Sequence, residues 1–361
     1  MIKVNTVAYK GSKRKLLKDI EKYIKEIGAK TVFDGFSGTG IVSAYLRSQG
    51  YEVCANDLNY SSYIYGKVFL EGYDEITVGK VIEQLNFLDS KEGWLTQNYS
   101  GERERTIRGT GGEVQLRPMA FQGKNSSRID AARDYIETLS LDERNKNALI
   151  FSIVLAADKV FNNSNDQKSA LKKWQTKALR DIKFELPTLI SGPVGKQFKG
   201  NILELDTPEV DVAYLDPPYT HGVLYDTCYH ISENIALWDK PELDHSYALP
   251  RASRVALKKE KRESGSFYSK GRKKSQKGLK SPAALCFKQL LGRLKCKRII
   301  LSYSDAPRNV LTIQNMCNIG KQYGNLTVYS KDHKICTQAS IFNKISTTLK
   351  EYFIIIDRET I

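Results

Sequence analysis

The sequence predicts an α/β protein whose core is a doubly wound, mostly parallel sheet. Two observations support this fold class: short apolar segments typical of strands alternate with longer segments of helical periodicity, and a glycine-rich turn joins the first strand to the next helix. The chain has 361 residues, more than one average domain, so we expect an inserted second unit. With 41% hydrophobic and 10% aromatic residues, it is too apolar to be mainly disordered.

The N-terminal 60 residues predict a helix followed by a βαβ unit. The first helix carries apolar side chains at every third or fourth position and stops at Gly28. The second strand ends at the polar pair Asn56 and Asp57. The expected elements are a helix at 12–27, a strand at 31–34, a helix at 41–47 and a strand at 51–55.

A change of pattern after residue 60 marks the inserted unit. Residues 61–88 and 131–185 have helical character, whereas 93–130 are rich in Gly, Ser, Arg and Gln without periodicity, which indicates loops. We therefore expect a largely helical insertion at 61–196. The sheet domain then comprises residues 1–60 and 197–361, with further strands at 210–215, 298–303, 326–329 and 352–356.

The net charge of +15 predicts a polyanionic partner. Residues 251–280 contain twelve basic and two acidic residues, so two thirds of the net charge lies in this segment. Phosphate contact explains it best, because Lys and Arg clusters release counterions on binding DNA; a solubilising loop is the alternative. The expected DNA-binding residues are Arg251, Arg254, Lys258, Lys259, Lys261 and Arg262, with Lys172 and Lys173 beside Trp174, although a core Trp flanked by solvated lysines fits that pair equally well.

Cysteine and histidine positions give no sign of a metal site or a disulfide framework. The six cysteines form no CxxC pair and the four histidines lack metal-ligand spacing. The N-terminus does not resemble a signal peptide, and no apolar run approaches the roughly 18 residues of a membrane span. We therefore expect a cytoplasmic protein without metal or membrane partner.

The glycine-rich turn predicts a cofactor site at the carboxyl edge of the sheet. Glycines there allow a tight turn and the close approach of a ligand, and Asp57 could bind the ribose hydroxyls of a nucleoside cofactor. A nicotinamide dinucleotide would use the same acid, but the spacing is Gly-x-x-Gly-x-Gly instead of Gly-x-Gly-x-x-Gly. A tight turn with an acidic helix cap is the alternative without a ligand. The candidate residues of the turn are Asp34, Gly35, Phe36, Gly38 and Gly40.

The segment Asp216-Pro-Pro-Tyr219, directly after an apolar strand, predicts a catalytic site for an aromatic amine. Two prolines fix the backbone and hold the carbonyls rigidly. An amine conjugated to a nucleobase is a poor nucleophile, but if Asp216 and the Pro217 carbonyl accept its hydrogens, its lone pair becomes available. Tyr219 would stack on the base. A proline-rich turn with a solvent-facing Tyr is the alternative.

Together these motifs resemble the amino-methylating DNA methyltransferases that use S-adenosylmethionine, in particular the D12 class of adenine-N6 enzymes that contains the Dam methylase. Tyr9-Lys-Gly-Ser-Lys13 is similar to the N-terminal cofactor loop of that group, the glycine turn to its methionine-binding loop, and Asp57 to its ribose-binding acid. The motif order, with a long insertion before the catalytic motif, resembles the α arrangement. Local similarity also occurs at Tyr229–Asn234 and Ile300–Ser304.

The resemblance implies a Rossmann-like methyltransferase that binds S-adenosylmethionine through Tyr9, Lys13, Asp34, Asp57, Asp216 and the glycine turn. The family often has Asp where this chain has Asn201, so Asn201 is the expected but less typical contact. The target adenine would be flipped out of double-stranded DNA, and the insertion would recognise the target sequence. A cognate restriction endonuclease is an expected partner.

Several other functions are weighed against this one. Cytosine-C5 methylation would need a nucleophilic Cys after a Pro, which the chain lacks, and related cytosine-N4 enzymes usually have Ser where this motif has Asp216. An RNA amino-methyltransferase would share the chemistry, and a non-catalytic DNA-binding subunit would share the fold. A long insertion favours DNA, since reading a duplex sequence requires extra surface.

Overall fold

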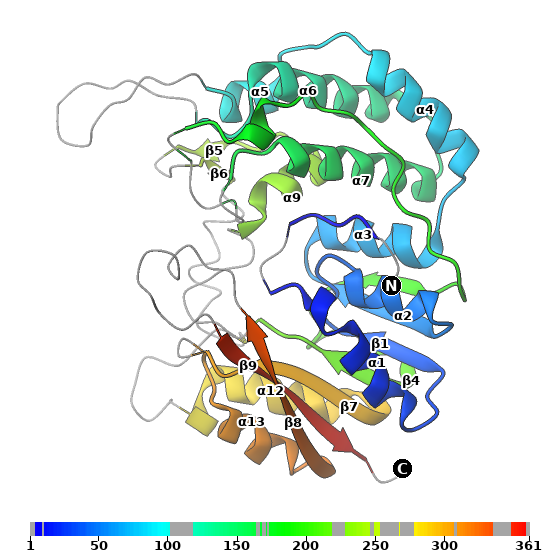
Figure 1. Ribbon diagram of the computed structural model, residues 1–361, viewed down its shortest axis with the longest axis vertical. Helices are drawn as coiled ribbons and strands as arrows, with labels where there is room; N and C mark the ends of the chain where they lie inside the picture. The colour runs from blue at the N-terminus through cyan, green and yellow to red at the C-terminus, as the bar shows by residue number, and fades with distance from the viewer. Residues whose placement is uncertain are drawn as a thin grey trace, which may run out of the picture.

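The computed structural model shows a helical part and a sheet part stacked along the long axis of the molecule (Figure 1). Helix α3 lies between the two parts. The structure describes residues 4–8, 11–101, 118–163, 167, 171, 173–218, 228–245, 249–252, 267, 278–306, 309–334 and 348–358.

The main sheet has seven strands in the order β3-β2-β1-β4-β7-β9-β8. The strands from β3 to β7 are all parallel, whereas β9 is antiparallel to both of its neighbours. The mostly parallel α/β sheet expected from the sequence is therefore confirmed. Its strands are β1 (Thr31–Asp34), β2 (Glu52–Asp57), β3 (Lys196–Lys199), β4 (Glu209–Leu215), β7 (Lys295–Ser304), β8 (Asn325–Lys334) and β9 (Thr348–Asp357).

The strand order reverses between β1 and β4. From β1 the chain continues outward to β2 and β3, and it then returns to the other side of β1 to form β4. In open parallel sheets such a switch point leaves a crevice at the carboxyl ends of the two strands, which is where ligands bind. The turns after β1 and β4 are the two motif-bearing segments of the sequence.

Helices cover both faces of the sheet because alternate side chains of each strand point to opposite sides. Val32 of β1 and Val212 of β4 pack in the core on the side of α1, α2 and α3, whereas Phe33 and Ala213 pack in the core on the side of α12 and α13. The sheet domain is therefore a three-layer structure. These helices are α1 (Leu17–Lys25), α2 (Ile41–Ser48), α3 (Tyr60–Glu71), α12 (Pro282–Arg293) and α13 (Ile313–Gly320), with short 3-10 turns at Lys13–Lys15 and Gly278–Lys280.

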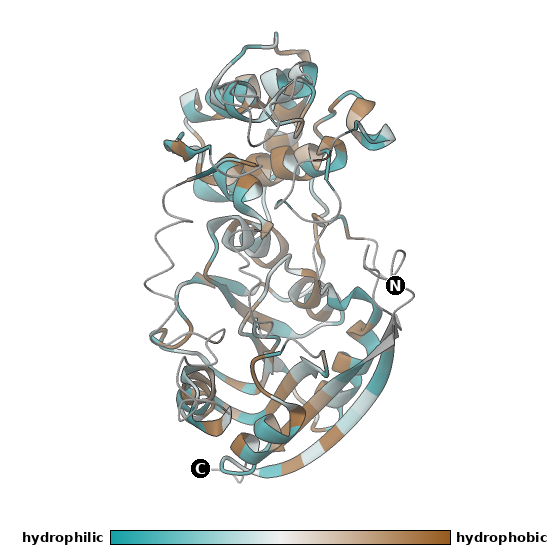
Figure 2. Ribbon diagram, turned by 90° about the vertical axis from the view of Figure 1, so that its left-hand side faces the viewer, coloured by the Kyte–Doolittle hydropathy of each residue, from teal (hydrophilic) through white to brown (hydrophobic). Residues whose placement is uncertain are grey.

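Helix α7 is the centre of the helical part. It contacts α3, α4, α6 and α9, and its residues from Ala148 to Ala157 are all buried. Figure 2 shows apolar segments on the helices of this part, and one apolar cluster continues from α7 through α3 to the sheet. The helices are α4 (Glu75–Phe87), α5 (Trp94–Tyr99), α6 (Gly123–Thr138), α7 (Glu143–Val160) and α9 (His230–Leu237), beside a small hairpin of β5 (Leu243–Asp244) and β6 (Arg251–Ala252).

Three elements differ from the sequence-based expectation. The segment 93–130 is not all loop, because α5 lies within it and α6 begins at Gly123. The edge strand β3 was not expected. Helical structure was expected as far as residue 185, but the described residues between α7 and β3 contain only a 3-10 turn at Thr176–Leu179.

The described part of the chain holds no helix long and apolar enough to cross a bilayer. It also contains no group of three or more His, Cys, Asp or Glu side chains placed to bind a metal ion.

Candidate active site

Three carboxylates predicted from the sequence lie at the carboxyl edge of neighbouring strands. Asp34 ends β1, Asp57 ends β2 and Asp216 directly follows β4. Because these strands are parallel and adjacent in the sheet, their ends meet at one edge. The switch point thus lies between Asp34 and Asp216.

Asp34 is a buried acid whose two oxygens differ in their contacts. Its Oδ2 accepts a hydrogen bond of 2.6 Å from the Ser43 hydroxyl of α2, while its Oδ1 has no partner among the described residues. Burial raises the pKa of Asp34 to about 7, and the nearby Asp216 and Asp57 add to this increase. A cationic group at Oδ1 would remove the cost of the buried charge.

The glycine turn places backbone amides next to these acids. Gly38 and Gly40 both have positive φ, at 52° and 73°, which side chains other than glycine rarely adopt. The Gly38 amide donates to Asp57 Oδ2 at 2.8 Å. A Cβ on Gly35 would lie 2.7 Å from side-chain atoms of Ile202 and Leu215, so the turn is tightly packed against the sheet. The half-buried Phe36 makes an edge contact with Phe267.

The Asp57 carboxylate accepts hydrogen bonds from two backbone amides, one in the glycine turn and one in the turn after β2. Besides the Gly38 amide, the Asn59 amide donates to its Oδ1 at 3.0 Å. Burial raises the pKa of Asp57 to about 6, although these two hydrogen bonds oppose the shift. The adjacent Asn56 side chain is buried and donates to the Gly200 carbonyl at 3.2 Å, which ties the end of β2 to the turn after β3.

Asp216 forms an ion pair that the sequence did not predict in full. Its Oδ1 lies 3.0 Å from the Lys13 ammonium, and the same ammonium lies 3.1 Å from Glu351 Oε1. Glu351 also accepts a 2.5 Å hydrogen bond from the Ser302 hydroxyl. Burial raises the pKa of Asp216 to about 6; Lys13 lowers it and Glu351 raises it. Lys13 was expected to bind cofactor, and the structure places it directly against Asp216.

The remaining predicted site residues have different positions. Pro217 is buried directly after Asp216, whereas Tyr9 and Tyr219 lie outside the described residues. Asn201 is exposed in the turn after β3, and its amide donates to Glu204 at 2.7 Å. The same side chain accepts from the Leu203 amide, so Asn201 stabilises its own turn.

Comparison with known proteins decides the family. The model of the family described as D12 class N6 adenine-specific DNA methyltransferase matches residues 9–274. The chain belongs to this family. The matched range contains the glycine turn, the three edge carboxylates and the Asp216-Pro-Pro-Tyr219 motif, so the resemblance inferred from these motifs is confirmed.

Curated relatives of this methyltransferase are bacterial and viral. Type II methyltransferase M.NlaIII of Neisseria lactamica is 30% identical over 64% of this chain and 69% of that protein. M.FokI of Planomicrobium okeanokoites is 29% identical over 87% of this chain but 46% of its own length. M.CviAII of Paramecium bursaria Chlorella virus 1 is 28% identical over 92% of this chain and 93% of that protein. The methyltransferase thus spans less than half of M.FokI.

The predicted DNA-binding residues of the methyltransferase fall mainly outside the described residues. These are Lys172, Arg254, Lys258, Lys259, Lys261 and Arg262. Lys173 is exposed between α7 and the following 3-10 turn. Arg251 is partly buried in β6, where it lies opposite Asp244 of β5 in the antiparallel register. Their role in DNA binding stays a prediction.

Sequence reasoning did not identify Glu351 or Glu233. Glu351 lies more than 300 residues from Lys13 in sequence, and only the register of the last strand brings the two together. Glu233 lies in α9, within the Tyr229–Asn234 segment that resembles the family. It accepts hydrogen bonds from the Tyr60 and Ser61 amides, both 2.8 Å long, at the N-terminus of α3. The segment was noticed, but its contact partner could not be read from it.

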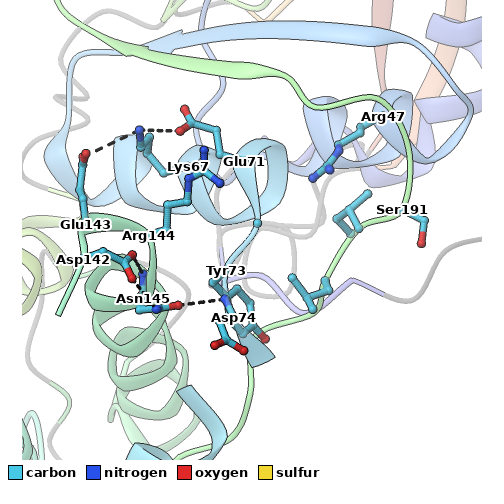
Figure 3. A pocket seen from close by; sticks show the side chains of 13 residues that line it. Arg47, Lys67, Glu71, Tyr73, Asp74, Asp142, Glu143, Arg144, Asn145 and Ser191 are labelled. Carbon is cyan, nitrogen blue, oxygen red and sulfur yellow. Dashed lines mark hydrogen bonds and ion pairs between the residues drawn. The ribbon is translucent and has the colours of Figure 1, made fainter. Parts of the chain in front are cut away.

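A polar pocket of about 1010 Å³ lies at the other end of α3 (Figure 3). At a rise of 1.5 Å per residue, the 12 residues of α3 separate it from Asp57 by about 18 Å. Two of its charged groups are held by neighbouring groups: Lys67 pairs with Glu71 at 2.6 Å and Asp142 caps α7. The pocket is therefore separate from the carboxyl edge of the sheet.

Proposed function

We propose that this methyltransferase transfers a methyl group from S-adenosylmethionine to N6 of a flipped adenine in double-stranded DNA at a short recognition sequence. The observation that carries the proposal is the position of Asp216. It stands at the switch point of the sheet, beside Asp34 and next to the buried Pro217, with one oxygen held by Lys13.

The edge of the sheet fits the proposed cofactor. S-adenosylmethionine, when bound, supplies an electrophilic methyl group on a sulfonium. Asp34 Oδ1, buried and without a partner among the described residues, would accept from its ammonium group. Asp57 would accept from its ribose hydroxyls. The glycines of the turn have no side chains, which leaves room for the cofactor to approach the edge of the sheet.

Asp216 and Pro217 would prepare the target nitrogen. The adenine must leave the helix, since its N6 cannot reach a cofactor from inside the base stack. Asp216 and the Pro217 carbonyl accept the two N6 hydrogens, so that the lone pair becomes available for the new N–C bond. As this bond forms, the bond between the methyl group and the cofactor sulfur would break, and the positive charge would pass to N6, which would then release one proton to the Asp216 carboxylate. Positioning supplies much of the rate, and Tyr219 is the proposed stacking partner of the base.

The remaining parts of the chain would bind and read the duplex. We propose that residues 61–196 carry target recognition on the catalytic domain of residues 1–60 and 197–361, and that the basic segment 251–280 contacts phosphates. The structure places α9 and the β5–β6 hairpin against the helical part, so this surface would extend beyond the insertion. The names of the curated relatives, including Modification methylase StsI, support a role in restriction–modification with a cognate endonuclease.

Substitution of Asp216 tests this function directly. We expect Asp216→Ala to lower kcat for transfer of labelled methyl groups to DNA by at least roughly 100-fold, because the target amine loses its acceptor. Glu71→Gln, which alters a shielded ion pair away from the site, should retain activity. Full activity of Asp216→Ala would contradict the proposal.

Two further measurements separate the alternatives. Competition between duplex DNA and structured RNA for methylation distinguishes the nucleic-acid substrate. Calorimetry with S-adenosylmethionine tests for a non-catalytic DNA-binding subunit, which would fail to bind it.

A further inference from the structure

We propose that Glu351 is a positioning residue of the methyl-transfer reaction: it shares the Lys13 ammonium with Asp216, so that the three groups together present a net negative charge to the target amine. This inference rests on the role proposed above for Asp216. It adds to the site a side chain from the last strand of the sheet, outside the residues 9–274 that the family model matches.

The topology brings Glu351 to the catalytic edge. Strand β9 runs antiparallel to β7, so its first residues lie where the parallel strands end. Glu351 pairs in register with Ser304, the last residue of β7. It therefore stands at the same edge of the sheet as Asp216, which follows β4 next to β7.

Burial makes the contact between Glu351 and Lys13 strong and specific. Glu351 is 4% exposed and Lys13 5% exposed, whereas the Asp216 side chain retains 20% exposure. The one ammonium thus lies between an enclosed carboxylate at 3.1 Å and a more open carboxylate at 3.0 Å. Ser302, itself fully buried, donates to the same Glu351 oxygen and fixes its orientation.

A packing role alone does not explain a glutamate at this position. Glu351, Phe353 and Ile355 lie on the same face of β9 because side chains alternate along a strand. Phe353 and Ile355 are buried apolar residues of the core. Burying a charged group costs more than burying an apolar side chain of similar size, even when the charge is paired.

The charges of the three groups explain what Glu351 contributes. Lys13 alone would neutralise Asp216, and a neutral pair would offer little stabilisation to the positive charge that develops on the amine. With Glu351 present, the three groups have a net charge of −1. The oxygen of Asp216 that Lys13 does not contact can then accept the amine hydrogen with the negative charge retained.

Replacement of Glu351 by Gln tests this balance. Gln has a similar size and can still accept from Ser302, but the group of three becomes neutral. We expect kcat to fall by roughly 10-fold to 100-fold, with KM for DNA and for S-adenosylmethionine changed less than about 3-fold. A defect of folding would instead lower the active fraction, which active-site titration measures. Unchanged kcat in Glu351→Gln would overturn the inference.

A double substitution separates charge balance from a structural effect. Lys13→Met leaves two carboxylates without the cation that they share, so a proton will bind to Asp216 for part of the time and block its acceptor oxygen. Removing Glu351 from that background leaves Asp216 as a single carboxylate with a charge of −1. We therefore expect Lys13→Met/Glu351→Gln to be more active than Lys13→Met alone, although Glu351→Gln is harmful to the wild type. Additive losses would overturn the inference. If wild-type protein transfers no methyl group, or Asp216→Ala is fully active, the proposed function itself fails.

Discussion

The carboxylates at the three strand ends share one property: burial raises the pKa of each. Asp34 reaches about 7, and Asp57 and Asp216 about 6. Several negative groups without a cation of their own are costly to enclose. Lys13 compensates Asp216, whereas the side chain that donates to Asp34 is the neutral Ser43 hydroxyl. Asp34 is thus the acid whose buried negative charge a cationic ligand would stabilise most.

The raised pKa of Asp34 predicts how stability depends on pH. A carboxyl group whose pKa is higher in the folded state binds its proton more tightly there, so stability falls as pH rises from 3.8, its unfolded value, to about 7. We expect Asp34→Asn, which can still accept from Ser43, to remove this contribution. Between pH 5.5 and pH 8, urea unfolding should show the wild type losing about 2 kcal/mol more than the variant.

Comparing the two proteins over the same pH range cancels the part of the Asp57 and Asp216 contributions that does not depend on Asp34. The prediction therefore concerns the difference of two slopes and does not depend on the absolute stability of either protein. Parallel pH profiles of the wild type and Asp34→Asn would show that Asp34 is already ionised at low pH.

At the scale of elements, the sequence predicted strands well when they contained a run of apolar or β-branched residues and helices well when their inward faces were apolar. Strands β1, β2, β4, β7, β8 and β9 were each located. Strand β3 was not, because an edge strand of four residues with Phe198 as its one large apolar side chain gives little signal. Helix α6 was located incompletely because polar residues, among them Asn125, Asp130 and Arg133, lie on its buried side.

The buried polar residues of α6 stabilise two other helices. Asp130 accepts from the Leu95 and Thr96 amides at the start of α5. Arg133 donates to the Ile235 and Ala236 carbonyls at the end of α9. Such contacts provide hydrogen-bond partners for the free backbone amides and carbonyls at helix ends. Because they use polar side chains, they leave no periodic apolar pattern in the sequence.

Glu233 makes an equivalent contact close to the carboxyl edge of the sheet. Its carboxylate joins α9 to the first amides of α3, three residues after Asp57. We expect Glu233→Gln to lower the free energy of unfolding by about 1–2 kcal/mol, through loss of one acceptor and of a negative charge at a helix N-terminus. Because the turn after Asp57 would loosen, affinity for S-adenosylmethionine should fall several-fold in calorimetry.

The matched control for Glu233 is an exposed glutamate on a helix. Glu83→Gln on α4 alters a solvated side chain and should stay within about 0.5 kcal/mol of the wild type. Equal stability and equal cofactor affinity of the two variants would show that Glu233 does not couple α9 to α3.

At the scale of the whole molecule, most of the net positive charge lies in one short segment, outside the sheet strands at whose ends the proposed catalytic carboxylates lie. Residues 251–280 are thirty of the 361 residues, yet they hold +10 of the net +15. The proposed chemistry needs a few buried carboxylates in the sheet domain, whereas affinity for a duplex depends on exposed cations. Catalysis and DNA affinity should therefore be separable by substitution.

Neutralising part of the basic segment tests this separation. If Lys258, Lys259, Lys261 and Arg262 each contact a phosphate, replacing all four by Gln should reduce the slope of log K against log salt by about 3 to 4, since each phosphate contact contributes about 0.9. Binding should weaken on specific and unrelated duplexes alike, while kcat at saturating DNA is retained. A control with the exposed Lys18, Lys22, Lys25 and Lys30 replaced by Gln has the same change of net charge. Fluorescence anisotropy over a salt series measures both, and equal slopes for the two variants would show that overall charge, and not this segment, determines DNA affinity.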